Sequence, residues 1–357
     1  MFTKKIALVF LILFSMVTLI QAQSKGTIVY VLVMNDVKID PETGEWPDMP
    51  IIYLLEDEGY EVIKFYNASL STAEQATLDT LYNADLIIYG RSVPSLDLGN
   101  HKEAWNLIPT PTLCLEMWAV RSSRLNWFNT TSMLSVTEEG TIHNAIIEKP
   151  DDPVFAGLDV SAPVPWVFAP FDAIGTKDAG NGIVLARHDI DSTVFFVRFE
   201  PDVEFYPGSG DYPAGHRTLI GNGRDNSGQA PFNYYNFTGE SEKVFLAEVA
   251  RMVALGKALH EGVEKEAARP RTCTLVQNYP NPFNATTNIE FMLSKPGHTT
   301  LQVFDVQGKL VKTLVNQHLN AGLHKVPFSA SDLSTGVYYY SIQHDGFTDV
   351  KKMILIK

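Results

Sequence analysis

Cysteine is scarce in this sequence. Of 357 residues only two are cysteines, Cys114 and Cys273. A disulfide scaffold is therefore excluded, and the core must be held together by packing. Cys114 lies in an apolar stretch and Cys273 in a charged one, so a disulfide between them is possible but not favoured.

Positive charge is also in short supply. The chain has 28 Lys and Arg against 41 Asp and Glu, which gives a formal net charge of −13. The basic residues are scattered and form no stripe. This composition disfavours nucleic acid or an anionic membrane as a general partner.

Long apolar runs are missing everywhere except at the N-terminus. There, Lys4 and Lys5 precede an apolar run over 6–20, and small residues follow it. The run is too short for a good membrane span and is typical of a signal peptide, which we place at 1–22. Because no cysteine follows it, a lipoprotein anchor is not expected. We expect export to the periplasm and no transmembrane anchor after cleavage.

Signatures of metal and phosphate binding are missing too. The acidic residues between 36 and 48 lack the spacing of a calcium loop, and the Gly-rich stretch 207–228 has no phosphate-loop pattern. His188 and His216 have no partner at metal-ligand spacing, so each is expected to be structural. We therefore expect no cofactor and no metal.

Strand and helix patterns alternate over most of residues 24–260. Apolar, β-branched segments predict strands at 26–34, 61–66, 84–89 and 112–116. Helices are expected between them, one opened by Asp48 and one by the capping-box pair Ser71 and Glu74. This order predicts an α/β fold with a flavodoxin-like parallel sheet and helices on both faces. A closing helix over 242–259 and a charged linker at 261–274 complete the domain.

The C-terminal segment 275–357 has a different pattern. Short alternating runs separated by turn residues predict strands at 287–293, 299–306, 310–314, 322–328, 336–342 and 350–356. Such a series is typical of a small all-β sandwich.

Four motifs in this segment suggest its role. They are NYPNPFN at 278–284, VFDVQG at 303–308, LSTGVYYY at 333–340 and KKMILIK at 351–357. In this order and spacing the segment resembles the C-terminal sorting domain of type IX secretion cargo in Bacteroidetes and related Gram-negative bacteria. The resemblance implies the type IX machinery as a partner and an extracellular or outer-membrane surface location. The alternative is an appended adhesion or carbohydrate-binding sandwich of the same fold.

The large domain carries a weaker resemblance. The first strand, GYEV at 59–62, ADLIIY at 84–89 and DPVFAGL at 152–158 resemble the class I glutamine-amidotransferase-like superfamily, particularly its trehalose-utilisation (ThuA-like) branch. That superfamily implies a nucleophilic cysteine, activated by a histidine and a glutamate. Here Glu116 stands at the nucleophile position, Cys114 falls two residues earlier, and Glu200 replaces the histidine. The resemblance therefore implies the fold without glutamine amidotransferase activity.

The strand ends supply the candidate site. Ligands of parallel sheets bind at the carboxyl ends of the strands, so we expect Arg91, Glu116 and Glu200 to come together there. Trp118 beside them could stack on a sugar ring. Three hypotheses remain open: a ligand-binding domain, with carbohydrate as a candidate ligand; an extracellular glycoside hydrolase using the carboxylates of Glu116 and Glu200; and a structural or partner-binding surface module.

Overall fold

The computed structural model describes residues 24–32, 46–65, 75–138, 140–221, 235–261, 273–294, 297–319 and 322–357. The predicted signal peptide, the capping pair Ser71 and Glu74, the acidic residues 36–45 and most of the linker lie outside these ranges.

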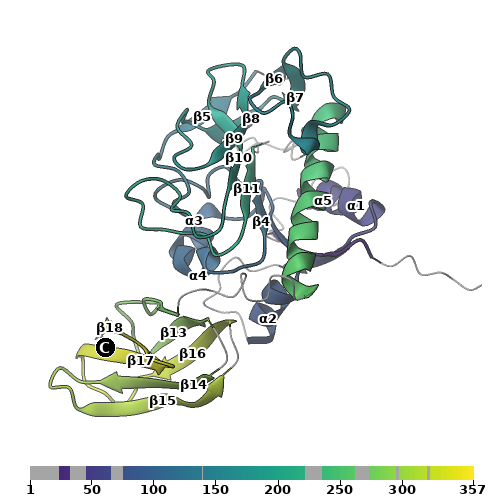
Figure 1. Cartoon of the computed structure of the whole chain (residues 1–357). Helices are drawn as coiled ribbons and strands as arrows, with labels where there is room; N and C mark the ends of the chain where they lie inside the picture. The colour runs from purple at the N-terminus through teal and green to yellow at the C-terminus, as the bar shows by residue number, and fades with distance from the viewer. Residues whose placement is uncertain are drawn as a thin grey trace, which may run out of the picture.

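A nine-stranded sheet forms the centre of the large domain (Figure 1). Its strand order is β2-β1-β3-β4-β11-β10-β9-β6-β7. The strands are β1 (Thr27–Val31), β2 (Glu61–Phe65), β3 (Leu86–Tyr89), β4 (Thr112–Cys114), β6 (Ile142–Ile147), β7 (Val164–Phe168), β9 (Ile183–His188), β10 (Val194–Phe199) and β11 (Arg217–Ile220). A separate pair is formed by β5 (Met133–Val136) and β8 (Phe171–Ile174).

The first half of the sheet agrees with the sequence. Strands β2, β1, β3, β4 and β11 pair in parallel. All four residues of β3 are buried, as expected for a strand covered on both faces. The prediction of a βαβ arrangement is correct for this half.

The second half corrects the prediction of a flavodoxin-like parallel sheet. Strand β10 runs antiparallel to β11 and to β9, and β6 runs antiparallel to β9 and β7. The chain between β9 and β10 covers only residues 189–193. A connection of that length cannot hold a crossover helix, so the two strands must form an antiparallel pair. The sheet is therefore mixed.

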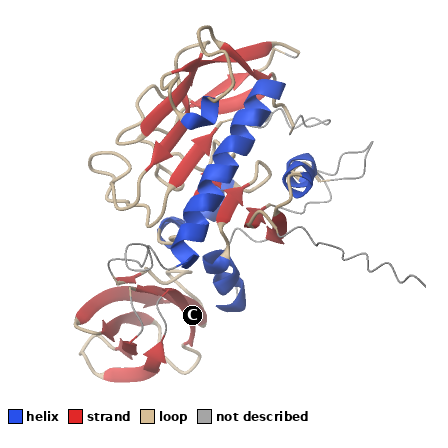
Figure 2. Ribbon diagram, turned by 45° about the vertical axis from the view of Figure 1, so that its right-hand side comes forward, coloured by secondary structure: helices blue, strands red, loops and turns tan. Residues whose placement is uncertain are grey.

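The helices are α1 (Met49–Asp57), α2 (Gln75–Asn83), α3 (Ser95–Asn100), α4 (Lys102–Asn106) and α5 (Gly239–Glu261), with a 3₁₀ turn at Pro153–Phe155. Figure 2 shows α5 crossing the large sheet as one long helix. Its buried stripe has helical spacing and includes Val244, Phe245, Val249 and Met252. No helix in the described part of the chain has both the length and the apolar character needed to cross a membrane.

A buried ion network fastens α5 to the antiparallel half of the sheet. The Arg198 guanidinium on β10 donates to Asp152 at 2.6 Å and to Glu248 of α5 at 2.6 Å. Arg251 and the hydroxyl of Thr218 also donate to the Glu248 carboxylate, each at 2.7 Å. Burial opposes ionisation of Glu248, but the hydrogen bonds from Arg251 and Arg198 hold its pKa below the usual value. The fully buried carboxylate is thus compensated on every side.

The C-terminal segment is a two-layer sandwich with its own core. One layer has the order β12-β13-β16 and the other β15-β14-β17-β18. Its strands are β12 (Thr274–Leu275), β13 (Thr286–Leu293), β14 (Gly297–Phe304), β15 (Leu310–Leu319), β16 (Gly322–Ser329), β17 (Gly336–His344) and β18 (Phe347–Leu355). Side chains such as Phe291, Val303 and Tyr340 fill the space between the layers. The all-β prediction is confirmed for this segment; only β12 was not expected.

The outer face of β13 and β16 rests on the large domain. Met292 and Leu323 are cross-strand partners on this face, and both are buried in the hydrophobic cluster of the large domain. The Tyr82 hydroxyl of α2 lies 3.5 Å from the Met292 sulfur, and Figure 1 shows α2 beside β16. The His101 ring meets the Tyr279 ring edge-on at 4.9 Å. The sandwich is therefore packed against the large domain and is not connected to it by the linker alone.

Candidate functional site

The carboxyl edge of the parallel strands holds two of the predicted site residues. Arg91 follows β3 and Glu116 follows β4, and the last residues of these strands, Tyr89 and Cys114, are paired in register. Both site residues are almost completely buried, at 0% and 1% exposure. The structure therefore brings Arg91 and Glu116 to one edge of the sheet, inside the fold rather than at its surface.

Glu116 shapes the turn that leaves β4. Its carboxylate Oε1 accepts the backbone N–H of Trp118 at 3.0 Å, and its carbonyl accepts from the Cys114 thiol at 3.3 Å. Burial, reinforced by the nearby Glu116 carboxylate, raises the pKa of the Cys114 thiol. Cys114 is thus a core residue, as the sequence suggested, and a thiol in this environment is a poor nucleophile.

Trp118 is the most accessible of the predicted residues that do lie at this edge. Its half-buried indole donates from Nε1 to Asp172 Oδ2 at 3.1 Å, and Asp172 also accepts the Ser135 hydroxyl at 2.5 Å. The Arg121 guanidinium lies 4.5 Å from the Trp118 ring centre, within cation–π range. Sequence patterns missed Asp172 and Ser135, because the small sheet β5–β8 that carries them gave no recognisable alternation.

Arg91 is part of a second buried arrangement. The Asp48 carboxylate accepts the Tyr30 hydroxyl at 3.0 Å and the backbone N–H groups of Arg91 at 2.9 Å and Ser92 at 3.1 Å; the Ser92 hydroxyl donates to it as well. The Arg91 guanidinium lies 5.0 Å from the Phe237 ring centre. Asp48 was predicted to cap α1; it occupies the N-cap position, but its side chain makes no capping hydrogen bond and instead fixes the loop after β3.

Glu200 lies at the opposite edge, which corrects the predicted carboxylate pair. Glu200 follows Phe199, the last residue of β10. Phe199 pairs with Arg217 of β11, and Arg217 pairs with Thr112 at the start of β4. Because β10 runs antiparallel to β4, its carboxyl end meets the amino end of β4. Glu200 is exposed there and lies 3.3 Å from His216 Nδ1. The prediction that Glu116 and Glu200 converge is wrong, and the glycosidase hypothesis loses its catalytic pair.

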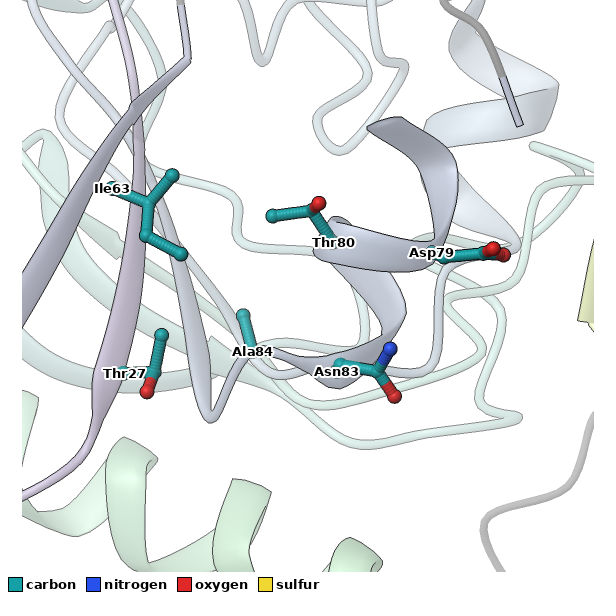
Figure 3. Close-up of a pocket in the computed structure, with 6 residues that line it drawn as sticks. All are labelled: Thr27, Ile63, Asp79, Thr80, Asn83 and Ala84. Atoms are coloured by element: carbon teal, nitrogen blue, oxygen red, sulfur yellow. The ribbon is translucent and has the colours of Figure 1, made fainter. Parts of the chain in front are cut away.

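A shallow pocket also opens at the amino edge of the sheet (Figure 3). Its volume is about 400 Å³, and it lies between the strands β1 and β2 and the helix α2, lined by Thr27, Ile63, Asp79, Thr80, Asn83 and Ala84. None of the predicted site residues contributes to it. The lining has no histidine or cysteine and gives no sign of catalytic chemistry.

The histidines belong to no metal-binding cluster within the described residues. His188 is fully buried, its ring centre 4.4 Å from that of Phe195 and 5.1 Å from that of Phe171. Burial lowers its pKa to about 4, so the ring is neutral at pH 7. Among the described residues no group of three His, Cys, Asp or Glu side chains is placed to hold a metal ion.

In the C-terminal sandwich the first motif is locked to the strands of the later motifs. The backbone N–H of Asn278 donates to the Tyr340 hydroxyl at 2.7 Å, and that hydroxyl donates to the carbonyl of Val276 at 2.8 Å. The buried Asn278 amide donates to the Thr287 hydroxyl at 3.0 Å. Two segments more than sixty residues apart are thus joined by one buried polar network.

The same motif covers the edge of the last strand. Phe283 donates to the carbonyl of Ile354 at 2.9 Å and accepts from the N–H of Ile356 at 2.9 Å. The side chains of Asn281 and Gln277 bond the N–H of Ile354 and the carbonyl of Lys352. An uncovered edge would present these groups to any passing strand. The motif therefore completes the sandwich and protects its C-terminal end.

Comparison with protein families agrees with the C-terminal motifs. Residues 277–357 match the family described as "Secretion system C-terminal sorting domain". The predicted sorting domain is therefore confirmed for this segment, and it supports a role as a secreted protein. The match does not extend to the large domain, so the amidotransferase-like resemblance is not shown. A search of curated proteins finds no match to the chain.

Solved structures give only distant similarities. The chain is similar to PorZ, a surface component of the type-IX secretion system of Porphyromonas gingivalis (16% identity, 26% of this chain and 12% of that one, TM-score 0.19). It is also similar to the twitchin kinase region from C. elegans (11%, 36% and 27%, TM-score 0.19) and to an endo-β-1,4-mannanase from Thermotoga petrophila (14%, 92% and 64%, TM-score 0.21). This chain spans less than two thirds of each, and scores this low establish no common fold.

Proposed function

We propose that this protein is cargo of the type IX secretion system, carried by its sorting domain to the cell surface or the extracellular space. The match of residues 277–357 to the sorting-domain family carries the proposal. The compact sandwich supports it, since all four sequence motifs contribute to one folded unit. The remainder of the chain, from about residue 24 to residue 260, would be the exported domain that carries the protein's own activity.

For this large domain we propose an amidotransferase-like fold that binds a ligand at the carboxyl edge of the parallel strands. The half-buried Trp118 supports this, because Asp172 fixes its indole and Arg121 lies against its ring. An aromatic ring beside a guanidinium offers apolar contact and several hydrogen-bond donors, a combination suited to a carbohydrate. Arg91 and Glu116 would act from beneath, by holding the loops in place.

The same edge argues against amidotransferase chemistry. The Cys114 thiol is buried and donates to a backbone carbonyl. Glu116, at the nucleophile position, is committed to the N–H of Trp118, and Glu200, at the histidine position, lies at the opposite edge of the sheet. The domain would therefore bind without turnover.

Export is tested by deletion. In a bacterium that carries the secretion system, the full chain should leave the cell, and a variant without residues 274–357 should remain in the periplasm. Normal release of the truncated protein would reject the proposal. Circular dichroism of the truncated protein confirms that it is folded.

Binding is tested separately on the purified full-length protein. We expect a glycan array to show ligands that are bound but not cleaved, with binding reduced at least tenfold by Trp118→Ala. Tyr212→Ala, an exposed aromatic residue near the amino edge of the sheet, is the matched control and should bind normally. Equal binding by both variants would show that the site does not include Trp118. Cleavage of a bound glycan would restore the hydrolase hypothesis.

A further inference from the structure

The sorting domain has two outer sheet faces, and only one of them is open. On the face of β13 and β16, Met292 is fully buried and Leu323 is 2% exposed, both against the large domain. Tyr279 of the first motif also contacts that domain, through His101. Whatever recognises the docked sorting domain must therefore approach the other layer, β15-β14-β17-β18.

The outer face of this layer is divided into a polar half and an apolar half. In the polar half, side chains of neighbouring strands bond to one another: Thr300 to Asn316 at 3.4 Å and Gln302 to Thr313 at 3.2 Å. The polar side chains of these pairs hydrogen-bond to each other, which is typical of a sheet face exposed to solvent.

The apolar half is built from cross-strand neighbours. Phe304 pairs with Leu310 on one side and with Tyr339 on the other, and Tyr339 pairs with Lys352. Leu310 is 47% exposed and Tyr339 is 38% exposed. Further exposed or half-buried apolar residues extend the same patch: Val337 and its cross-strand partner Ile354, and Val306 and Ile356 in the segments that follow β14 and β18. We call this set, together with Phe304, Leu310 and Tyr339, the apolar patch.

The patch coincides with the sorting motifs. The motif at 303–308 contributes Phe304 and Val306, the motif at 333–340 contributes Val337 and Tyr339, and the last motif contributes Ile354 and Ile356. Side chains alternate along each strand, so the inward members of these motifs, such as Val303, Tyr340 and Leu355, form the core. Packing explains the inward members; it does not explain exposed apolar side chains gathered in one place.

We infer that the apolar patch is the surface by which a component of the export machinery recognises this sorting domain. The inference rests on the proposed function and adds the location of the contact. The charged groups at the patch are Lys352, in the row of Tyr339, Lys309, in the adjoining turn, and the Asp305 carboxylate of that turn, which accepts the N–H groups of Gln307 and Lys309. The two ammonium groups outnumber the one carboxylate. The partner surface is therefore apolar with an acidic rim.

A second copy of this chain fits the patch less well. A two-fold dimer would place the same patch on both sides of the interface, so the interface would contain Lys352 and Lys309 of both copies. The excess of positive charge at such an interface disfavours self-association at neutral pH.

The test compares two full-length double variants that each add two carboxylates to the same sheet face. The patch variant is Tyr339→Asp with Ile354→Asp, and the control is Gln302→Asp with Gln343→Asp in the polar half. In a secretion-competent bacterium we expect at least tenfold less exported patch variant, with accumulation in the periplasm, and normal export of the control. Thermal melting of the purified proteins should leave both within a few degrees of wild type.

Normal export of the patch variant would overturn the inference. If it fails to fold, Tyr339→Ser with Ile354→Thr provides the same comparison with residues compatible with strands. A wild-type dimer that the patch variant converts to a monomer would assign the face to self-association and also overturn it. The deletion of 274–357 separates the two proposals: retention of the deletion with export of the patch variant rejects only the patch.

Discussion

Leu323→Asp tests whether the sorting domain is docked on the large domain. Leu323 is 2% exposed and lies beside Met292 in the interface with α2. Removing a buried leucine costs about 1.5–3 kcal/mol of the free energy of docking. A carboxylate in the same place costs more, because the docked interface would strip it of its hydration. We therefore expect the ratio of docked to undocked molecules to fall at least ten- to hundredfold.

Hydrogen–deuterium exchange measures this directly. In the variant, exchange should rise in residues 78–83 of α2 and in β16, while β3 and β17 stay protected because the two cores remain folded. Small-angle scattering should show a larger radius of gyration. Leu310→Asp makes the same chemical change at an exposed position of the sandwich and should alter neither measurement. Unchanged protection of α2 in Leu323→Asp would refute the docked arrangement.

Through His101, acidification should weaken the same interface. Burial, and secondarily the nearby Lys325, lower the pKa of His101 to about 4 from an ordinary value of 6.5. The docked form thus holds His101 in its neutral state. The free energy that favours docking therefore falls by at most about 3 kcal/mol as the pH drops from 6.5 towards 4. Exchange in α2 should rise over this range in wild type and much less in His101→Gln. A pH-independent interface would contradict the burial of this ring.

Three further predictions concern the large domain. Cys114→Ser should lower the free energy of unfolding by about 1–3 kcal/mol, because a hydroxyl replaces a buried thiol. Neither wild type nor this variant should show glutaminase activity. Rapid labelling of Cys114 in the folded protein would contradict its core position. His188→Phe should reduce the acid destabilisation between pH 6.5 and 4, since His188 is neutral when folded with a pKa of about 4; an unchanged pH profile in denaturant unfolding would count against it. Glu248→Gln should cost about 1.5–3 kcal/mol, because it removes the charged acceptor that Arg198 and Arg251 share while Asp152 still pairs with Arg198. By contrast, Arg187→Gln, in an exposed pair with Glu148, should cost at most about 1 kcal/mol; equal losses would show that the network carries no special stability.

Much of the fold could be predicted from local patterns. The apolar run of β1, the alternation of β13 and the buried stripe of α5 each reflect one element and its immediate surroundings. The same holds for the sorting motifs, whose turns and strands follow one another along the chain. These features need no knowledge of which distant segments meet.

The candidate site could not be predicted, because it depends on strand direction. The carboxyl end of β10 was expected beside that of β4, yet the five-residue connection before β10 and its antiparallel pairing send Glu200 to the other edge. The partner of Trp118 is Asp172, which lies 54 residues away on an unpredicted strand. Such contacts result from tertiary pairing, which single-segment periodicity does not contain.

The docking of the sandwich left one sequence signal. Met292 and Leu323 stand on the outer face of their sheet, where alternation calls for polar residues, and the structure covers both. Phe304, Tyr339 and Ile354 break the same rule on the opposite layer, where no described residue covers them. The parallel between the two faces is the reason to look for a partner at the second.

The most direct test of the central claim is the location of the protein in a secretion-competent bacterium, with and without its sorting domain. Wild type should be found outside the cell or on its surface, and the protein lacking residues 274–357 should accumulate, folded, in the periplasm. Adding residues 274–357 to a periplasmic reporter protein should in turn carry the reporter out. Release of the truncated protein at the wild-type level, with the reporter left in the periplasm, would contradict the account.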